Sequence, residues 1–194
     1  MRHGLSAALA LLGTALPLAI AVAAPKDPSG VWLTEDKRAR VRVEKCGSAQ
    51  DRLCGYIVWL KPDTKSDRKG PLLDVNNPDP KKAKRPVVGH QLILGLKAND
   101  DDQYEGSIYN ADDGKTYDVT IWLEKPGDLK VKGCLIGFLC STQSWTVATG
   151  KVPGQLEAPT GAPDGPRPDP EWATKATPAA VGASEPKRDA KPRS

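Results

Sequence analysis

The sequence has few of the residues and motifs that mark common enzymes and metalloproteins. It contains two histidines, and only His90 lies beyond the first 23 residues. One histidine in that part of the chain excludes most two-histidine metal sites. It has no G-x-S-x-G motif and no glycine-rich phosphate loop after a strand. The net charge of +4 is too mild and too dispersed to indicate nucleic-acid binding. We therefore expect a protein that is not an enzyme and that uses no cofactor or metal.

Long apolar runs are absent beyond the N-terminus. Residues 1–23 begin with a basic residue, continue as an apolar run from Leu5 to Val22 and end in small residues. This order is typical of a cleaved signal peptide. An uncleaved membrane anchor is the alternative, but Gly13 and Pro17 interrupt the run. We expect an exported, periplasmic protein with no membrane span after cleavage.

The four cysteines form two close pairs, Cys46 with Cys54 and Cys134 with Cys140. Four cysteines allow three connectivities, and zinc is an alternative use. Neither pair has the usual zinc spacing of two to four residues, and exported cysteines are more often disulfide-bonded. Cys46 ends one alternating run and Cys54 begins the next, so a hairpin would bring their Cα atoms within bridging range. We expect two local disulfides.

Short runs of alternating apolar and polar residues dominate the middle of the chain, and no strong helical period is present. Eight such runs fit an antiparallel up-and-down barrel, whereas a two-layer sandwich is the alternative. The runs are Gly30–Leu33, Arg38–Glu44, Leu53–Leu60, His90–Leu96, Tyr104–Asn110, Thr116–Leu123, Leu129–Leu135 and Ser141–Val147.

One run, Leu53–Leu60, is apolar on both faces. Strict alternation places Tyr56 and Val58 on one face and Ile57 and Trp59 on the other. This strand must be covered on both sides or end near the lip of the sheet. His90, at the end of the next run, is expected to be a polar group on the rim.

The connection from Lys61 to Arg85 is rich in proline and contains two polar clusters. Residues 74–80 favour a structured turn, and a polar ligand contact is the alternative. The basic run 81–85 is expected to be a solvated loop, with an anion or membrane-surface patch as the alternative. Further on, residues 110–115 resemble a calcium loop, but Tyr109 and Ala111 stand where it needs carboxylates, so a plain turn is expected.

The composition changes near residue 150, after which half of the prolines lie. This predicts three segments: a signal peptide at 1–23, a β-barrel domain at 24–149, and a disordered tail rich in proline and alanine at 150–194. Trp172 in the tail is expected to be a stray aromatic residue, and docking on a partner is the alternative.

Gly30-Val31-Trp32 resembles the first signature of the lipocalin superfamily, in which the tryptophan plugs the closed end of the barrel. A longer ordered set resembles DUF2147, a family of exported bacterial proteins. The lipocalin resemblance implies an arginine packed over the tryptophan, where this chain has Val147. The DUF2147 set comprises Gly30-x-Trp32, Arg40-Val41, Cys46, Leu53-Cys54-Gly55, Ile57-Val58-Trp59-Leu60, Asp74-x-Asn76-Asn77-Pro78, Gly89, Gly106-x-Ile108-Tyr109, Asp113-Gly114-Lys115-x-Tyr117, Leu129-x-Val131-x-Gly133 and Gln143-x-Trp145.

An eight-stranded barrel without a catalytic set predicts a binding module for a small apolar or amphipathic ligand. A structural or protein-interaction module of the cell envelope is the second hypothesis, and an enzyme is the third. The sequence does not indicate the oligomeric state. The candidate wall residues are Trp59, Tyr109, Tyr117 and Trp122, and the candidate polar contacts are Asp74, Asn76 and Asn77.

Overall fold

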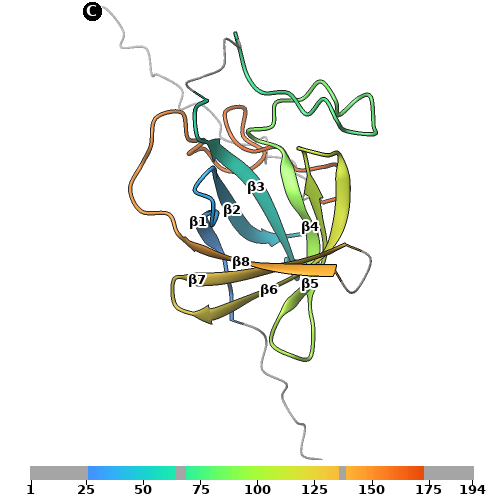
Figure 1. Cartoon of the computed structure of the whole chain (residues 1–194), viewed down its shortest axis with the longest axis vertical. Coiled ribbons are helices and arrows are strands. Elements are labelled where there is room, and N and C mark those ends of the chain that lie inside the picture. Colours follow the sequence, from blue (N-terminus) through green and yellow to red (C-terminus); the bar gives the residue numbers. More distant parts are fainter. Residues whose placement is uncertain (1–25, 64–68, 136–138, 173–194) are drawn as a thin grey trace, which may run out of the picture.

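The computed structural model describes residues 26–63, 69–135 and 139–172, whose eight strands form a closed antiparallel barrel (Figure 1). Each strand pairs with its sequence neighbours, and β1 closes the barrel against β8. The predicted up-and-down barrel is therefore confirmed over the sandwich. The strands are β1 (Gly30–Leu33), β2 (Ala39–Cys46), β3 (Arg52–Leu60), β4 (Gln91–Ala98), β5 (Tyr104–Asn110), β6 (Lys115–Lys125), β7 (Asp128–Leu135) and β8 (Leu139–Val147).

The sequence predicts a signal peptide at the N-terminus and no membrane span after its cleavage. The predicted signal peptide, residues 1–23, lies outside the described residues. Among the residues that are described, no helix has the length and apolar character needed to cross a membrane.

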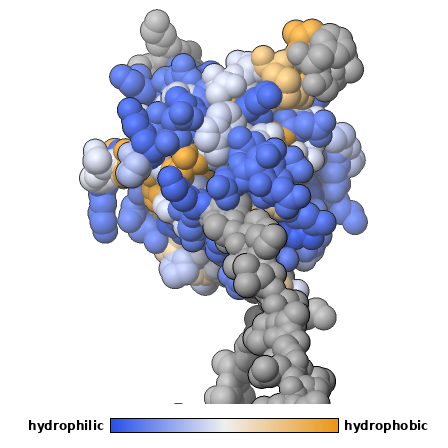
Figure 2. Space-filling model, turned by 90° about the horizontal axis from the view of Figure 1, so that it is seen from below, coloured by the Kyte–Doolittle hydropathy of each residue, from blue (hydrophilic) through white to orange (hydrophobic). Residues whose placement is uncertain are grey.

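Trp32 closes one end of the barrel. Its side chain is 4% exposed, and its indole Nε1 donates a 2.8 Å hydrogen bond to the carbonyl of Pro28 in the N-terminal segment. In the barrel register Trp32 lies opposite Val147 of β8. The β4–β5 turn lies at this end, and hydrophilic residues cover most of the face seen in Figure 2. The open end, described below, is therefore the more promising place for a ligand.

Alternation along the strands places apolar side chains in the interior. Burying a side chain of this size contributes about 1.5–3 kcal/mol relative to leaving it exposed. The aliphatic side chains of Val41, Val43, Leu53, Ile93, Leu96, Ile121 and Leu129 are all at most 1% exposed. This packing fixes the curvature of the wall that carries the sites.

Residues 148–172, which we name the strap, lie along the outer face of β2, β3 and β4 (Figure 1). Arg40 donates to the carbonyls of residues 149 and 150, and Arg42 donates to those of residues 156 and 158. The aromatic ring of Trp172 packs directly on Gly95. The packed chain thus extends beyond the predicted boundary at residue 149, held by hydrogen bonds to strap carbonyls and by the ring of Trp172. Residues 173–194 lie outside the described part.

The strap explains the run in β3 that is apolar on both faces. Ile57 points into the interior core, whereas Trp59 points outward to the strap. A β-bulge at Val58, which leaves Arg40 paired with Trp59 and Val41 with Ile57, makes strict alternation fail at this point. The indole Nε1 of Trp59 donates to the Pro153 carbonyl at 3.2 Å. The prediction that Ile57 and Trp59 share one face is therefore wrong.

Both predicted disulfides are present. Cys46–Cys54 joins β2 to β3, and Cys134–Cys140 joins β7 to β8, with Cα separations of 5.8 and 4.0 Å. Closing such short loops stabilises a fold by roughly 2–3 kcal/mol in the chain-entropy model. The first disulfide also packs with Tyr56 and Trp172 in a small second core on the outside of the barrel.

Candidate functional site

The open end of the barrel contains a pocket of about 510 Å³, which we name the mouth pocket. Its walls come from the β1–β2 turn, the end of β3, the β3–β4 loop, the start of β4 and the end of β5. An apolar wall below a polar rim suits a small amphipathic molecule. The apolar wall includes Ile57, Leu60, Leu72, Val87 and Leu92, and the rim includes Thr34, Asp36, Arg38, Asp63 and Asp112.

A second hollow of about 400 Å³ lies against the interior wall formed by β5 to β8. Gln143 of β8 lines both this hollow and the mouth pocket. Its other lining residues include Tyr117, Leu135, Leu139 and Trp145. Side chains therefore do not fill the barrel interior completely towards the open end.

The four aromatic residues predicted to form the ligand wall lie in different places. Tyr109 lines the mouth pocket and Tyr117 lines the second hollow. Trp59 and Trp122 are on the outside of the barrel, where Trp59 contacts the strap and the indole of Trp122 donates to Glu124 at 2.9 Å. Of these four residues, Tyr109 and Tyr117 are therefore the two that a ligand inside the barrel could contact.

The predicted polar contacts Asp74, Asn76 and Asn77 form a turn that fastens the β3–β4 loop. The Nδ2 atom of Asn76 donates to the carbonyl of Asp112 at 2.9 Å, and that of Asn77 donates to Asp74 at 2.8 Å. The carbonyl of Asn76 lies so close to Gly114 that a Cβ there would come within 1.9 Å of it. These side chains hold the loop against the β5–β6 turn.

The β5–β6 turn itself has the hydrogen bonds of ordinary turn chemistry. Asp113 accepts one from the backbone N–H of Lys115 at 3.0 Å and another from the hydroxyl of Tyr117. The Tyr117 hydrogen bond is the main reason that the pKa of Asp113 is lowered. Gly114 has a φ of 71°, which favours glycine. Within the described ranges, no three histidine, cysteine or acidic residues form a group that could hold a metal ion.

A buried polar network, which the sequence did not indicate, joins the β3–β4 loop to the strap. Asp74 is fully buried and accepts hydrogen bonds from the Tyr109 hydroxyl at 2.6 Å and from Arg85 Nε at 3.0 Å. Arg85 also pairs with Asp169 of the strap at 2.9 Å, and Lys82 pairs with the same carboxylate at 2.7 Å. Burial and the nearby Asp74 raise the pKa of Tyr109, so its hydroxyl stays protonated. Two members of the basic run 81–85 are thus ion-paired, which corrects the prediction of a solvated loop.

His90 lies inside this network and is not a rim group. Its side chain is 2% exposed and contacts the Tyr109 ring edge-on at 5.8 Å. Burial, followed by the charge of Arg85, lowers the pKa of His90 to about 4, although the charges of Asp74 and Asp169 oppose this shift. Neither ring nitrogen makes a hydrogen bond of normal geometry to the described residues. The imidazole is therefore neutral at pH 7.

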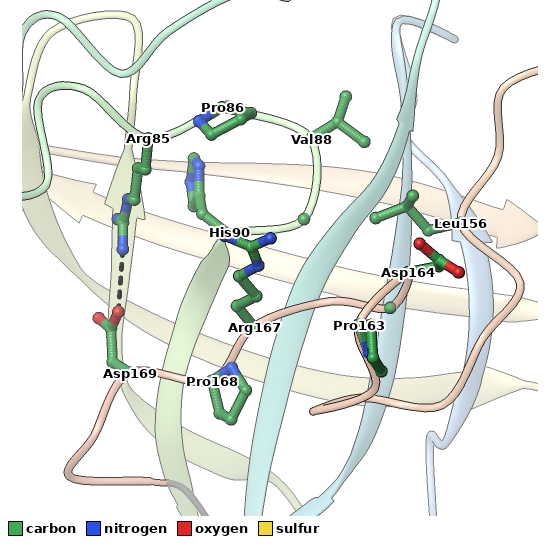
Figure 3. Close-up of a pocket in the computed structure, with 12 residues that line it drawn as sticks. Arg85, Pro86, Val88, His90, Leu156, Pro163, Asp164, Arg167, Pro168 and Asp169 are labelled. Atoms are coloured by element: carbon green, nitrogen blue, oxygen red, sulfur yellow. Dashed lines mark hydrogen bonds and ion pairs between the residues drawn. The ribbon is translucent and has the colours of Figure 1, made fainter.

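A third pocket, which we name the strap pocket, lies outside the barrel wall (Figure 3). Its volume is about 430 Å³, and it is enclosed by the segment before β4 on one side and by the strap on the other. Its side chains include Arg85, Pro86, Val88, His90, Leu156, Pro163, Asp164, Arg167, Pro168 and Asp169. Because more than half of this lining comes from a segment predicted to be disordered, the sequence pattern gave no sign of the pocket.

Comparison with solved structures gives a match to protein HP1028 from the human pathogen Helicobacter pylori, described as a member of the lipocalin family. The match has a TM-score of 0.52 and 22% identity, and it covers 63% of this chain and 84% of that one. At this identity the likeness shows a shared fold. Comparison with curated proteins found no match. The family model described as an uncharacterized protein conserved in bacteria, DUF2147, matches residues 30–147, and the chain belongs to this family.

Proposed function

We propose that this protein is a non-enzymatic periplasmic binding module that holds a small apolar or amphipathic ligand at the open end of its barrel. The observation that carries the proposal is the mouth pocket, with its apolar wall and its polar rim, beside a second hollow that shares the lining residue Gln143. A barrel of eight strands has room for one small ligand when side chains leave part of it empty. Tyr109 and Tyr117 are the aromatic residues that we assign to ligand contact.

Two further observations support export and the lack of catalysis. The pairing of all four cysteines suits an oxidising compartment such as the periplasm. The buried carboxylates of Asp74 and Asp169 are both bound by Arg85, so neither is positioned as a free general base. These carboxylates fasten the loop and the strap, and ligand binding is assigned to the mouth pocket.

Binding can be tested with a dansyl-labelled fatty acid, whose fluorescence rises when the probe leaves water. We expect saturable binding, and we expect Leu60→Gln in the apolar wall to weaken it about tenfold, because a leucine contact of this kind contributes about 1.5 kcal/mol or more. Val147→Gln, at a half-exposed position at the closed end of the barrel opposite Trp32, is the matched control and should leave the affinity unchanged. Native mass spectrometry of protein isolated from its own host would then identify the ligand. Absence of both probe binding and a co-purified molecule would refute the proposal.

A structural or protein-interaction role in the cell envelope is the second candidate. It is favoured by large apolar side chains that are exposed near the open end, namely Leu72, Leu73 and Val75 of the β3–β4 loop and Leu135 and Leu139 of the β7–β8 hairpin. A photo-crosslinker at Val75, compared with one at Val147, would separate the two roles. A specific protein adduct from Val75, together with no probe binding, would favour the interaction role.

A further inference from the structure

The strap pocket presents two charges that the protein itself leaves unpaired. Arg85 is bound by both buried carboxylates, and Asp169 is bound by Lys82 as well. Arg167 and Asp164 also line the pocket, yet neither side chain makes a hydrogen bond or ion pair within the described ranges. Both side chains are exposed, so a ligand can reach them from solvent. The free positive and negative groups of this pocket are therefore available to a ligand.

Apolar side chains accompany the two charges in the pocket. Figure 3 places Arg167 beside His90 and Asp164 beside Leu156 and Pro163, with Val88 above them. His90 is neutral at pH 7 and so adds no charge to the pocket. The result is a pocket that presents one positive and one negative side chain, with apolar side chains beside them.

Backbone contacts hold both sides of the pocket in place. The N–H of Arg167 donates to the carbonyl of Gly89 at 2.8 Å, and the N–H of Leu156 donates to the carbonyl of Val58 at 2.9 Å. The N–H of Asp169 donates to the fully buried side chain of Gln91 at 2.9 Å. The strap backbone that carries both side chains is therefore held in place before any ligand arrives, which lowers the entropic cost of binding.

We propose that the strap pocket binds a small zwitterion with an apolar body, that is, a free α-amino acid or a short peptide with an aliphatic side chain. The ligand carboxylate pairs with the guanidinium of Arg167, a geometry that can be bidentate. The ligand ammonium pairs with the carboxylate of Asp164, and its side chain lies against Val88 and Leu156. This site is separate from the mouth pocket, since the two pockets share Val88 alone among their lining residues and lie on opposite sides of β3.

Calorimetric titration of the whole mature protein with leucine and with the leucyl-leucine dipeptide tests the proposal. We expect one of these probes to bind, and we expect N-acetylation or C-terminal amidation of that probe to weaken binding at least tenfold. Arg167→Gln should abolish the preference for a free carboxylate, and Asp164→Asn should abolish the preference for a free ammonium. Tighter binding of the dipeptide would identify a peptide ligand, and tighter binding of leucine would identify an amino acid.

Matched controls separate these effects from general changes in charge or folding. Lys151→Gln and Glu171→Gln each remove one charge from exposed strap positions outside the pocket and should leave both preferences intact. Arg167 and Asp164 are exposed and unpaired, so their substitution should not lower the melting temperature. Failure of both probes to bind would overturn the proposal, and so would binding whose preferences survive the two pocket variants. Displacement of the dansyl-labelled fatty acid by the bound zwitterion would place the zwitterion at the mouth and would also overturn it.

Discussion

The inner and outer faces of the wall formed by β2, β3 and β4 are both buried, but different chemistry covers them. On the inside, Val43, Leu53 and Ile93 pack against other apolar side chains. On the outside, the strap is held by guanidinium groups that donate to backbone carbonyls and by the ion pairs of Asp169. Packing on the inner face therefore depends on the shape and volume of side chains, whereas attachment of the strap to the outer face depends on charge and hydrogen bonding.

This contrast also separates the two proposed ligand sites. The mouth pocket opens onto the apolar interior, so it selects ligands mainly by size and apolar area. The strap pocket lies on the polar exterior and presents fixed charges, so it selects ligands by the position of their charged groups. A single small barrel can in this way offer two unlike binding surfaces on the two sides of one sheet.

Asp74→Ala should show the largest effect, because it removes a fully buried carboxylate that binds Arg85, Asn77 and Tyr109. Breaking a buried ion pair by removing one partner costs about 3–5 kcal/mol. We expect the free energy of unfolding, measured in urea with the disulfides intact, to fall by about 3 kcal/mol. The loss lies at the low end of the range because Arg85 retains its ion pair with Asp169. Tyr109→Phe, which removes one hydrogen bond of the same group, should cost about 1 kcal/mol. Equal costs for the two variants would contradict a network centred on the carboxylate.

Lowering the pH should reduce the stability that the buried network around His90 contributes, and it should leave the contribution of the apolar interior unchanged. The pKa of His90 is about 4 in the folded protein against 6.5 for a free histidine, so the unfolded chain binds the extra proton first as the pH falls. Its stabilising contribution is complete above pH 6.5 and decreases from there towards pH 4, amounting to a loss of about 2 kcal/mol at pH 5. The groups facing His90 are Arg85, Asp74, Asp169 and Tyr109.

Unfolding in urea at pH 8 and at pH 5 measures this loss. His90→Gln should remove most of the difference between the two pH values. Leu129→Ala, in the fully apolar interior, should cost about 3 kcal/mol at both. The carboxyl groups of Asp27, Asp36 and Asp113 have lowered pKa values and therefore titrate below 3.8, outside this range. A pH dependence that persists in His90→Gln would show that another group is responsible.

The sequence predicted the inside of the molecule far better than the outside. Alternation is a local pattern, so the strands, the closed barrel and both hairpin disulfides could be predicted from neighbouring residues. The bulge that turns Trp59 outward arises from the pairing of β3 with β2. The alternation of residues within β3 contains no information about that pairing. The contact of Arg85 with Asp169 spans 84 residues and joins a loop to a strap of low apolar content. No local pattern relates these two positions, so the network and the strap pocket could not be found from sequence.

Arg42→Gln should have a small effect on stability and a clear effect on the strap. Arg42 is partly buried and donates to the carbonyls of Leu156 and Ala158 at 2.8 and 2.7 Å. Losing these bonds should lower the free energy of unfolding by about 1–2 kcal/mol, because water replaces part of what the guanidinium supplies. The strap should meanwhile become cleavable by protease at lower enzyme concentration.

Arg42→Gln should also separate the two proposed ligand sites, because Leu156 lines the strap pocket and the mouth pocket lies on the other side of the wall. We expect it to weaken binding of the zwitterionic probe and to leave binding of the dansyl-labelled fatty acid unchanged. Equal weakening of both would mean that the two faces of the wall are not independent.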